Sequence, residues 1–267
     1  MSSTLLYPIR MTRVSVIGCG NMGGALLRGL AESGNYTLTA CDLDPEAREA
    51  VAEYAETTDD PAVAADADIV VVAVQPHIAR DVVDDIELSS DQTLVTIAAG
   101  VSTGALADRT DATVVRVMPN LAAETRNMAA AVTESTVTDD VRSMLDDVGE
   151  FVEIDEELMD IATAVNGSGP AFVFYLIDAM RQAGVESGLD DEDARVLAAQ
   201  TFKGAAETVL RSDKDIETLI DAVCSPNGTT IEGMDVLWES DADKAVVDAV
   251  AAAERRSKEL ADESDDE

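Results

Sequence analysis

Three glycines near the N-terminus have the spacing with which a protein backbone binds the pyrophosphate of a dinucleotide. They form the pattern G-x-G-x-x-G within the stretch 18–23. Gly18 permits a tight turn, Gly20 lets the backbone approach the pyrophosphate, and Gly23 lets the next helix pack closely on the preceding strand. Free amide groups at the start of that helix favour bound phosphate. In this loop we predict cofactor contacts from Gly18, Gly20, Asn21, Met22 and Gly23.

The elements around the loop support this interpretation. Arg13–Ile17 is predicted to be a buried strand and Asn21–Ala31 a helix, so the glycines occupy a strand-to-helix turn. A second strand, Tyr36–Cys41, leads into Asp42, about twenty residues after the loop, where a ribose-binding carboxylate belongs. The alternative is a glycine-rich turn in some other α/β protein.

Further segments of small residues and prolines follow later predicted strands. In an open parallel sheet the ligand lies at the carboxyl ends of the strands. Such residues would let a nicotinamide ring and its ribose lie close to the backbone, whereas Arg116 is expected to form a structural ion pair. The predicted cofactor contacts in these segments are Val74, Gln75, Pro76, Ala98, Ala99, Gly100, Met118, Pro119 and Asn120.

Two segments of the C-terminal half, Asn166–Pro170 and Ser225–Thr230, combine glycine, proline and hydroxyl groups ahead of predicted helices. Each is typical of a helix N-terminus that binds an anion. Hydroxyl groups form hydrogen bonds without carrying charge. Together the two segments predict a polar, uncharged pocket for a small carboxylate substrate. The alternative is ordinary helix capping and turn formation.

The order of predicted elements gives the fold class. The strands are Val14–Ile17, Tyr36–Cys41, Ile69–Val74, Leu94–Ala98, Val114–Met118, Ala129–Thr133 and Phe151–Ile154, with helices at Pro45–Tyr54, His77–Ile86 and Val141–Val148 among those between them. Ile69–Val74 is continuously apolar, as in a central parallel strand. This alternation predicts a Rossmann-type, doubly wound parallel α/β sheet over residues 11–158, after an extension over residues 1–10.

The remainder is predicted to be an all-helical domain over residues 159–262, followed by an acidic tail over 263–267. The helices are Phe172–Ala183, Asp191–Arg211, Ile216–Val223, Ile231–Trp238 and Lys244–Leu260. Faces rich in alanine and poor in charge suggest that part of this surface is buried in an oligomer. The alternative is packing within the chain. The alanines concerned are Ala194, Ala198, Ala199, Ala205 and Ala206.

The negative net charge of the chain argues against two kinds of binding partner. Asp and Glu number 54 against 18 Lys and Arg, for a net charge of −36. Such a surface repels nucleic acid and anionic membranes, so neither is an expected partner. The acids are spread along the chain and do not indicate a cationic substrate. We expect a halophilic protein, whose self-repulsion is screened in a high-salt cytoplasm.

Metal and thiol chemistry are not expected. The three cysteines, Cys19, Cys41 and Cys224, lack the spacing of metal ligands or of a disulfide framework. They fit a reducing, cytoplasmic setting. His77 is the single histidine and is expected to be a solvated residue at a helix start. No segment has the length and apolarity of a membrane span or the order of a signal peptide.

An ordered set of motifs along almost the whole chain resembles the pyrroline-5-carboxylate reductase family. The motifs are Ile17–Gly23, Val74–Pro76, Ile97–Val101, Arg116–Asn120, Asn166–Phe172, Ala198–Thr201 and, most specific, Ser225–Glu232. The resemblance implies a helical dimerisation domain after the Rossmann domain, and a homodimer or a ring of dimers. It also implies reduction of 1-pyrroline-5-carboxylate to L-proline, the last step of proline biosynthesis, by hydride transfer from NADPH or NADH.

The resemblance also implies roles for residues. Thr230 is the implied catalytic residue, which hydrogen-bonds the ring nitrogen of the substrate. The implied substrate-binding residues are Ser225, Asn227, Gly228, Thr229, Gly167, Ser168, Gly169 and Asn120.

The chain departs from the family pattern at a few positions. Gln75 stands where lysine is common, Leu121-Ala122 replaces Thr-Pro, and Asn227 replaces a glycine. Asp42 is acidic where many members carry a small polar residue. A carboxylate repels the 2′-phosphate of NADPH, so Asp42 favours NADH, although the nearby Arg48 could offset this.

Other functions on this architecture are a related imine or hydroxyacid oxidoreductase and a non-catalytic dinucleotide sensor. A β-hydroxyacid dehydrogenase needs a lysine after the second-domain glycine turn, and Ala171–Arg181 contains none. A deazaflavin-dependent NADP reductase would not need the Ser225–Thr230 loop. Retention of that loop argues against a sensor.

Overall fold

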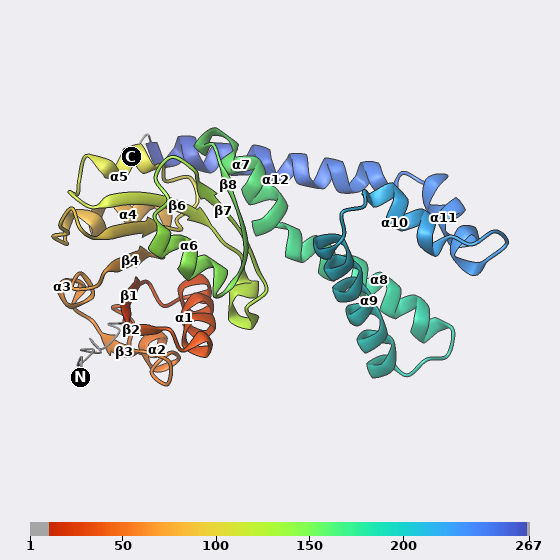
Figure 1. Ribbon diagram of the computed structural model, residues 1–267, viewed down its shortest axis with the longest axis horizontal. Helices are drawn as coiled ribbons and strands as arrows, with labels where there is room; N and C mark the ends of the chain where they lie inside the picture. The colour runs from red at the N-terminus through yellow and green to blue at the C-terminus, as the bar shows by residue number, and fades with distance from the viewer. Residues whose placement is uncertain (1–10, 266–267) are drawn as a thin grey trace, which may run out of the picture. The chain divides into compact units, whose positions relative to one another are not determined.

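The computed structural model describes residues 11–265 of the chain (Figure 1). The predicted N-terminal extension and the end of the acidic tail lie outside these residues. Contacts divide the chain into two compact units, one running to Gly167 and resuming at Ala253, the other spanning Ser168–Ala252. This division differs from the predicted border after residue 158.

Long-range hydrogen bonds explain why residues beyond 158 belong to the first unit. Asn166 Nδ2 donates to the carbonyl of Met118 at 2.6 Å and to that of Ala129 at 2.9 Å. Ser257, near the C-terminus, donates from its hydroxyl to Asp160 Oδ1 at 2.7 Å. Neither contact has a local signal in the sequence.

The first unit contains an eight-stranded sheet in the order β3-β2-β1-β4-β5-β6-β7-β8. The strands are β1 (Thr12–Ile17), β2 (Tyr36–Cys41), β3 (Glu56–Thr58), β4 (Ile69–Val72), β5 (Thr93–Thr96), β6 (Thr113–Met118), β7 (Met128–Thr133) and β8 (Gly149–Ile154). All neighbouring pairs are parallel except β6 and β7. The predicted Rossmann-type α/β sheet is therefore confirmed, with an antiparallel pair and the edge strand β3 added.

The antiparallel pair follows from the length of its connection. Only the short 3₁₀ helix η1 (Leu121–Thr125) lies between β6 and β7. A parallel crossover needs roughly a dozen residues or more, usually including a full helix, so the chain turns back instead.

Helices cover both faces of the sheet (Figure 1). Alternate residues of the central strands enter two cores, as Val14 and Val16 of β1 do on one face and Ile17 on the other. Residues of α1 and α6 complete the first core, and residues of α3, α4 and α5 complete the second. The helical segments of this unit are α1 (Asn21–Ser33), α2 (Pro45–Glu49), α3 (Pro61–Ala64), α4 (Pro76–Asp84), α5 (Thr103–Ala107), α6 (Asp139–Asp146), η2 (Glu156–Leu158), α7 (Met159–Ala162) and the π-helix η3 (Thr163–Gly167).

Helix α2 is shorter than the predicted Pro45–Tyr54 because it contributes little to the core. Within 45–54 only Val51 is fully buried. Residues after Glu49 continue as hydrogen-bonded turns, such as the 2.9 Å bond from Tyr54 N to Val51 O. One buried side chain does not favour a long amphipathic helix.

The second unit is helical, as predicted. Its helices are α8 (Gly169–Glu186), α9 (Asp191–Arg211), α10 (Ile216–Val223), α11 (Thr229–Trp238) and the first part of α12 (Ala242–Asp265). Helix α8 continues past the predicted Ala183, to Glu186. A Cβ at Gly184 would lie 3.2 Å from Ala194 Cβ, so glycine there lets α8 and α9 approach closely. Among the described residues no helix is long and apolar enough to cross a bilayer.

Only part of the alanine-rich surface packs within the chain. Ala194 and Ala198 are buried, whereas Ala199, Ala205 and Ala206 are exposed. Large apolar side chains are also exposed on every helix of the unit. They include Phe174, Tyr175, Met180, Val196, Leu197, Leu210, Ile216, Val223, Val236, Leu237, Trp238 and Val247. A folded unit that exposes this much apolar surface has the character of an interaction site.

Candidate active site

The glycine loop between β1 and α1 has the geometry of a dinucleotide-binding turn. Gly18 has φ +99°, and a Cβ on Gly23 would lie 1.9 Å from Gly18 O, so the backbone itself requires both glycines. A Cβ on Gly20 would meet no atom within 4 Å. Gly18 and Gly23 thus shape the turn, while Gly20 leaves open space beside the helix N-terminus.

Asp42 connects the glycine loop to the end of β2. Its Oδ2 accepts a 2.7 Å hydrogen bond from Cys19 N, and its Oδ1 accepts one of 2.9 Å from Asp44 N. Arg48 donates to the carbonyls of Asp42 and Leu43 at 2.5 and 3.1 Å and pairs with Asp59 at 3.7 Å. The guanidinium is therefore engaged beside the loop, but by other partners than the Asp42 carboxylate.

The thiols beside this loop are protonated and unreactive at neutral pH. Cys19 and Cys41 are buried, with Cys19 Sγ 3.4 Å from Cys41 O. Burial, followed by the negative charge of Asp42, raises the pKa of the Cys19 thiol to about 12 and that of Cys41 to about 11. Since the thiolate is the reactive form, neither side chain is a nucleophile here.

The other predicted cofactor segments follow neighbouring parallel strands. Val74–Pro76 runs from the loop after β4 into the first residue of α4, Ala98–Gly100 follows β5, and Met118–Asn120 starts at the last residue of β6. With the glycine loop after β1, the topology brings these segments to one edge of the sheet. A Cβ on Gly18 would lie 3.0 Å from Val74 Cγ1, so the loops after β1 and β4 touch. Gln75 and His77 lie at the start of α4, and both are exposed.

Asn120 is buried, and its side-chain amide forms hydrogen bonds with backbone groups. Its Nδ2 donates to Asn166 O at 3.1 Å, while its Oδ1 accepts from Ala122 N at 3.1 Å and from Ala129 N at 3.4 Å. Asn166, the first residue of the predicted substrate segment Asn166–Pro170, has a buried Oδ1 without a partner among the described residues. The two amides join the end of β6 to η3, a link visible in the sequence only as two separate Asn-containing motifs.

The Ser225–Thr230 loop is a tight turn that opens α11. Gly228 N donates to Ser225 O at 2.9 Å, and a Cβ on Gly228 would lie 2.5 Å from Ser225 Oγ. Asn227 has φ +57°, a left-handed conformation that asparagine tolerates better than most residues, which explains how it replaces glycine here. Gly228 is the N-cap, so Thr229 and Thr230 form the first turn, two residues earlier than predicted, and both are exposed.

The predicted substrate residues fall in both units. Asn120 and Gly167 belong to the first, whereas Ser168, Gly169 and the Ser225–Thr230 loop belong to the second. Ser168 is the N-cap of α8 and makes no side-chain capping bond. Its hydroxyl and the first backbone amides of α8 and α11 are groups of the kind that bind an anion at a helix N-terminus.

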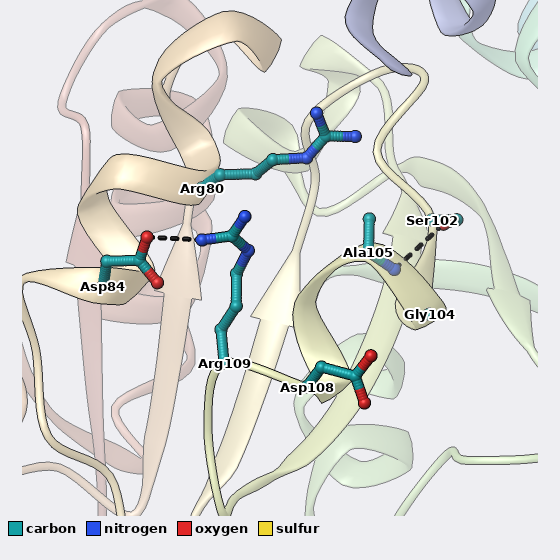
Figure 2. A pocket seen from close by; sticks show the side chains of 7 residues that line it. All are labelled: Arg80, Asp84, Ser102, Gly104, Ala105, Asp108 and Arg109. Atoms are coloured by element: carbon teal, nitrogen blue, oxygen red, sulfur yellow. Dashed lines mark hydrogen bonds and ion pairs between the residues drawn. The ribbon is translucent and has the colours of Figure 1, made fainter. Parts of the chain in front are cut away.

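A shallow depression between α4 and α5 has a different character (Figure 2). Arg80, Asp84 and Arg109 line it, and Arg109 forms an ion pair with Asp84. Asp108 balances the second arginine, so the depression has no net charge with which to select an anion. It contains none of the predicted cofactor residues.

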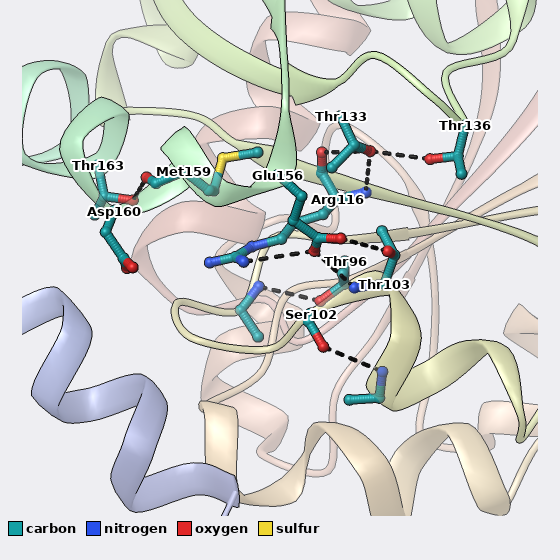
Figure 3. A network of polar contacts seen from close by, with 12 residues as sticks. Thr96, Ser102, Thr103, Arg116, Thr133, Thr136, Glu156, Met159, Asp160 and Thr163 are labelled. Atoms are coloured by element: carbon teal, nitrogen blue, oxygen red, sulfur yellow. Dashed lines mark hydrogen bonds and ion pairs between the residues drawn. The ribbon is translucent and has the colours of Figure 1, made fainter.

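Arg116 forms the expected structural ion pair. Its Nη1 lies 3.5 Å from Glu156 Oε1, and the side chain is buried (Figure 3). The sequence does not single out Glu156, because a glutamate in an acidic chain gives no signal and its partner lies forty residues away.

Family models match both parts of the chain. Residues 13–100 match the model described as NADP oxidoreductase, coenzyme F420-dependent. Residues 156–260 match the model of pyrroline-5-carboxylate reductase dimerisation. The second match contains both predicted substrate segments of the C-terminal half.

Similar proteins align with this chain over nearly its whole length. The pyrroline-5-carboxylate reductase of Methanosarcina acetivorans is 36% identical over 263 residues, which are 93% of this chain and 97% of the relative. That of Escherichia coli is 35% identical, over 93% and 98% of the two chains. The crystal structure of the Plasmodium falciparum pyrroline carboxylate reductase with NADP bound has a TM-score of 0.81 at 30% identity and covers 94% and 98% of the two chains. The chain described here belongs to the pyrroline-5-carboxylate reductase family.

Proposed function

We propose that this chain reduces 1-pyrroline-5-carboxylate to L-proline, the last step of proline biosynthesis, with NADPH or NADH as reductant. The observation that carries the proposal is the 36% identity to a reductase of that name over 93% of the chain. The open space at Gly20 and the exposed first turn of α11 supply the two binding features that such a reaction needs.

The residues of the sheet edge would hold the cofactor. The pyrophosphate would lie on the amides that begin α1, beside Gly20, and a ribose would lie near Asp42. When bound, the reduced nicotinamide supplies the hydride that reduces the imine carbon of the substrate. Val74–Pro76, Ala98–Gly100 and Met118–Pro119 would leave room for the ring along the strand ends.

The helical unit would bind and orient the substrate. Amides and hydroxyls of Ser225–Thr230, with those at Ser168 and Gly169, would bind the carboxylate, and Thr230 would hydrogen-bond the ring nitrogen. Because the protonated imine is already electrophilic, the chain needs no acid or base with a shifted pKa. Positioning of two reactants can contribute about 7–11 kcal/mol to such a reaction.

Asp42 supports a preference for NADH. Its carboxylate would accept from ribose hydroxyls and repel a 2′-phosphate. The NADP oxidoreductase model that matches residues 13–100 favours the opposite preference, so the assay must include both cofactors. We expect a higher kcat/KM with NADH, and a shift toward NADPH in Asp42→Asn, which removes the charge but keeps the size.

The assay follows absorbance of NADH and NADPH at high KCl, with and without 1-pyrroline-5-carboxylate, and measures the proline formed. Substrate-dependent oxidation with proline as product supports the function. Oxidation of neither cofactor, in a folded protein that binds the cofactor, contradicts it. An unchanged cofactor ratio in Asp42→Asn would remove Asp42 from the choice of cofactor.

Thr230→Ala should lower kcat/KM at least about tenfold, equivalent to roughly 1.4 kcal/mol, while the chain stays folded. The reason is loss of the hydroxyl next to the ring nitrogen. Thr230 is exposed at the start of α11, so its truncation leaves no cavity in the chain. Thr230→Ser keeps the hydroxyl and should retain most activity. Equal kinetics of the alanine variant and the parent would show that the hydroxyl has no role.

We also propose a high-salt, reducing cytoplasm as the working environment. The net charge of −36 and the free cysteines support this. The melting temperature should rise between about 0.1 M and 3 M KCl, because the Debye length falls from roughly 10 Å to below 3 Å and screens repulsion among carboxylates. Thermal unfolding followed by circular dichroism measures this. A melting temperature independent of KCl would refute the halophilic assignment.

The assembly we propose is a homodimer through the helical unit, and rings of dimers are an extension of it. The match of residues 156–260 to a dimerisation model supports the dimer. The exposed apolar side chains of α8 to α12 supply the surface.

A further inference from the structure

We propose that Glu156 is a positioning residue for the cofactor: its carboxylate fixes the segment Ala98–Thr103, which follows β5. The inference rests on the proposed function, because it takes Ala98–Gly100 to lie against the nicotinamide half of the cofactor. Glu156 acts on those residues through Thr103, which it binds directly.

The contact is specific in geometry. Glu156 Oε1 accepts from Thr103 N at 2.8 Å, and Oε2 accepts from Thr103 Oγ1 at 2.5 Å (Figure 3). One carboxylate thus binds both the amide and the hydroxyl of a single residue, which is the first residue of α5. Hydrogen bonds to an ionised acceptor are the stronger ones, and two on one residue fix its backbone as well as its side chain.

Arg116 holds the carboxylate in place from the sheet. Arg116 is 6% exposed, and its Nη1 lies 3.5 Å from the oxygen of Glu156 that accepts from Thr103 N. Thr133 Oγ1 accepts from Arg116 N at 3.1 Å and lies 3.4 Å from Arg116 O. The Arg116 Nε is buried without a hydrogen-bond partner among the described residues. A buried guanidinium of this kind strongly favours a charged partner, and Glu156 is the carboxylate that pairs with it.

The segment is also held at Gly100, in its interior. Gly100 has φ +78°, and a Cβ there would lie 2.9 Å from Ala261 Cα of α12. Two further hydrogen bonds stabilise this part of the chain. Val101 N donates to Ala98 O at 3.3 Å, and Ser102 Oγ accepts from Ala105 N at 3.2 Å as the N-cap of α5. The segment is therefore fixed at two residues. Gly100 is fixed by close packing against Ala261, and Thr103 is fixed by its hydrogen bonds to the Glu156 carboxylate. Of these contacts, the hydrogen bond from the Thr103 hydroxyl can be removed without a large change in side-chain volume.

Thr103→Val makes that test, since valine has nearly the shape of threonine but lacks the hydroxyl. The Kd for NADH, measured by fluorescence titration at high KCl, should rise about tenfold, the size expected for one lost hydrogen bond to a charged group. The KM for NADH should rise in parallel, while the KM for the imine substrate stays within about twofold. Thr103→Ser keeps the hydroxyl and should match the parent chain.

Glu156→Gln is the second variant of the NADH-binding experiment. It should weaken NADH binding to a similar extent. The double variant Glu156→Gln/Thr103→Val should bind NADH within about twofold of the poorer single variant, because both changes weaken the link between Glu156 and Thr103. Hydrogen exchange of the amides of residues 98–103, measured without cofactor, should be faster in Thr103→Val than in Thr103→Ser.

The outcomes separate this inference from the proposed function. If the parent chain binds NADH but does not reduce 1-pyrroline-5-carboxylate, the proposed function fails, and the Kd and exchange measurements still test the role of Glu156. Unchanged NADH affinity in Thr103→Val, or equal loss in Thr103→Val and Thr103→Ser, overturns the inference. Fully additive losses of NADH affinity in the double variant also overturn the inference, since they would show that Glu156 and Thr103 affect NADH binding independently.

Discussion

Gly23→Ala should destabilise the first unit by about 3 kcal/mol or more, whereas Gly20→Ala should leave the fold intact and weaken only the binding of NADH or NADPH. The two positions lie three residues apart in the same loop. A Cβ on Gly23 would lie 1.9 Å from Gly18 O, a backbone atom. Strand β1 and helix α1 must separate to relieve that overlap, and overpacking of this kind typically costs about 1–3 kcal/mol even against movable side chains.

Gly20→Ala differs because its methyl group would meet nothing in the chain within 4 Å. The group would instead occupy the space proposed for the pyrophosphate. We expect a melting temperature close to that of the parent chain and a Kd for NADH at least about tenfold higher, a loss of roughly 1.4 kcal/mol. Thermal unfolding and fluorescence titration of NADH, both at high KCl, measure the two effects separately.

Gly24→Ala is the matched control. It lies in the first turns of α1, where a Cβ would lie 3.2 Å from the flexible end of Arg28. Alanine is favoured over glycine by about 1 kcal/mol inside a helix, so this variant should be as stable as the parent chain or more so. Equal stability of Gly23→Ala and Gly24→Ala would contradict the packing assigned to Gly23. Unchanged NADH affinity in Gly20→Ala would move the pyrophosphate away from this loop.

Leu197→Asp should weaken the proposed homodimer at least about a hundredfold. Leu197 lies in the first half of α9 and is 58% exposed in the single chain. A two-fold interface contains every substitution twice. Full burial of a leucine is worth about 1.5–3 kcal/mol, so two copies that bury the remaining half of each side chain account for roughly 2–3 kcal/mol. Burial of two aspartates adds a further penalty.

Light scattering coupled to size-exclusion chromatography at high KCl, over a series of protein concentrations, measures the dimer. Val63→Asp is the control, because Val63 is a similarly exposed apolar residue, at 55%, but lies on α3 of the first unit. It should remain dimeric. Circular dichroism should show both variants folded. A Leu197→Asp chain that stays dimeric at the lowest concentrations would exclude this part of α9 from the interface.

Local patterns were sufficient for the parts of the fold that depend on neighbouring residues. The bounds of β2, α9 and α10 agree with the predicted segments, because apolar periodicity and capping residues such as Asp190 and Asp215 act within a few positions. The glycine turn is likewise local, since the φ of Gly18 and the contact of Gly23 arise within six residues. Family membership followed from ordered motifs, each of which is short.

Contacts between residues distant in the sequence decided the parts of the fold and of the site that local patterns did not predict. The sequence by itself determined the Rossmann-type class, the helical second half and the family. Only the tertiary structure showed that β7 runs antiparallel to β6, that the chain from Ala253 onward rejoins the first unit, and that Glu156 binds Thr103. The physical reason is that such contacts form between residues far apart in the sequence, such as Ser257 and Asp160, which are 97 positions apart. A single side chain there carries no periodicity, and its partner is selected only when the sheet and its helices have packed.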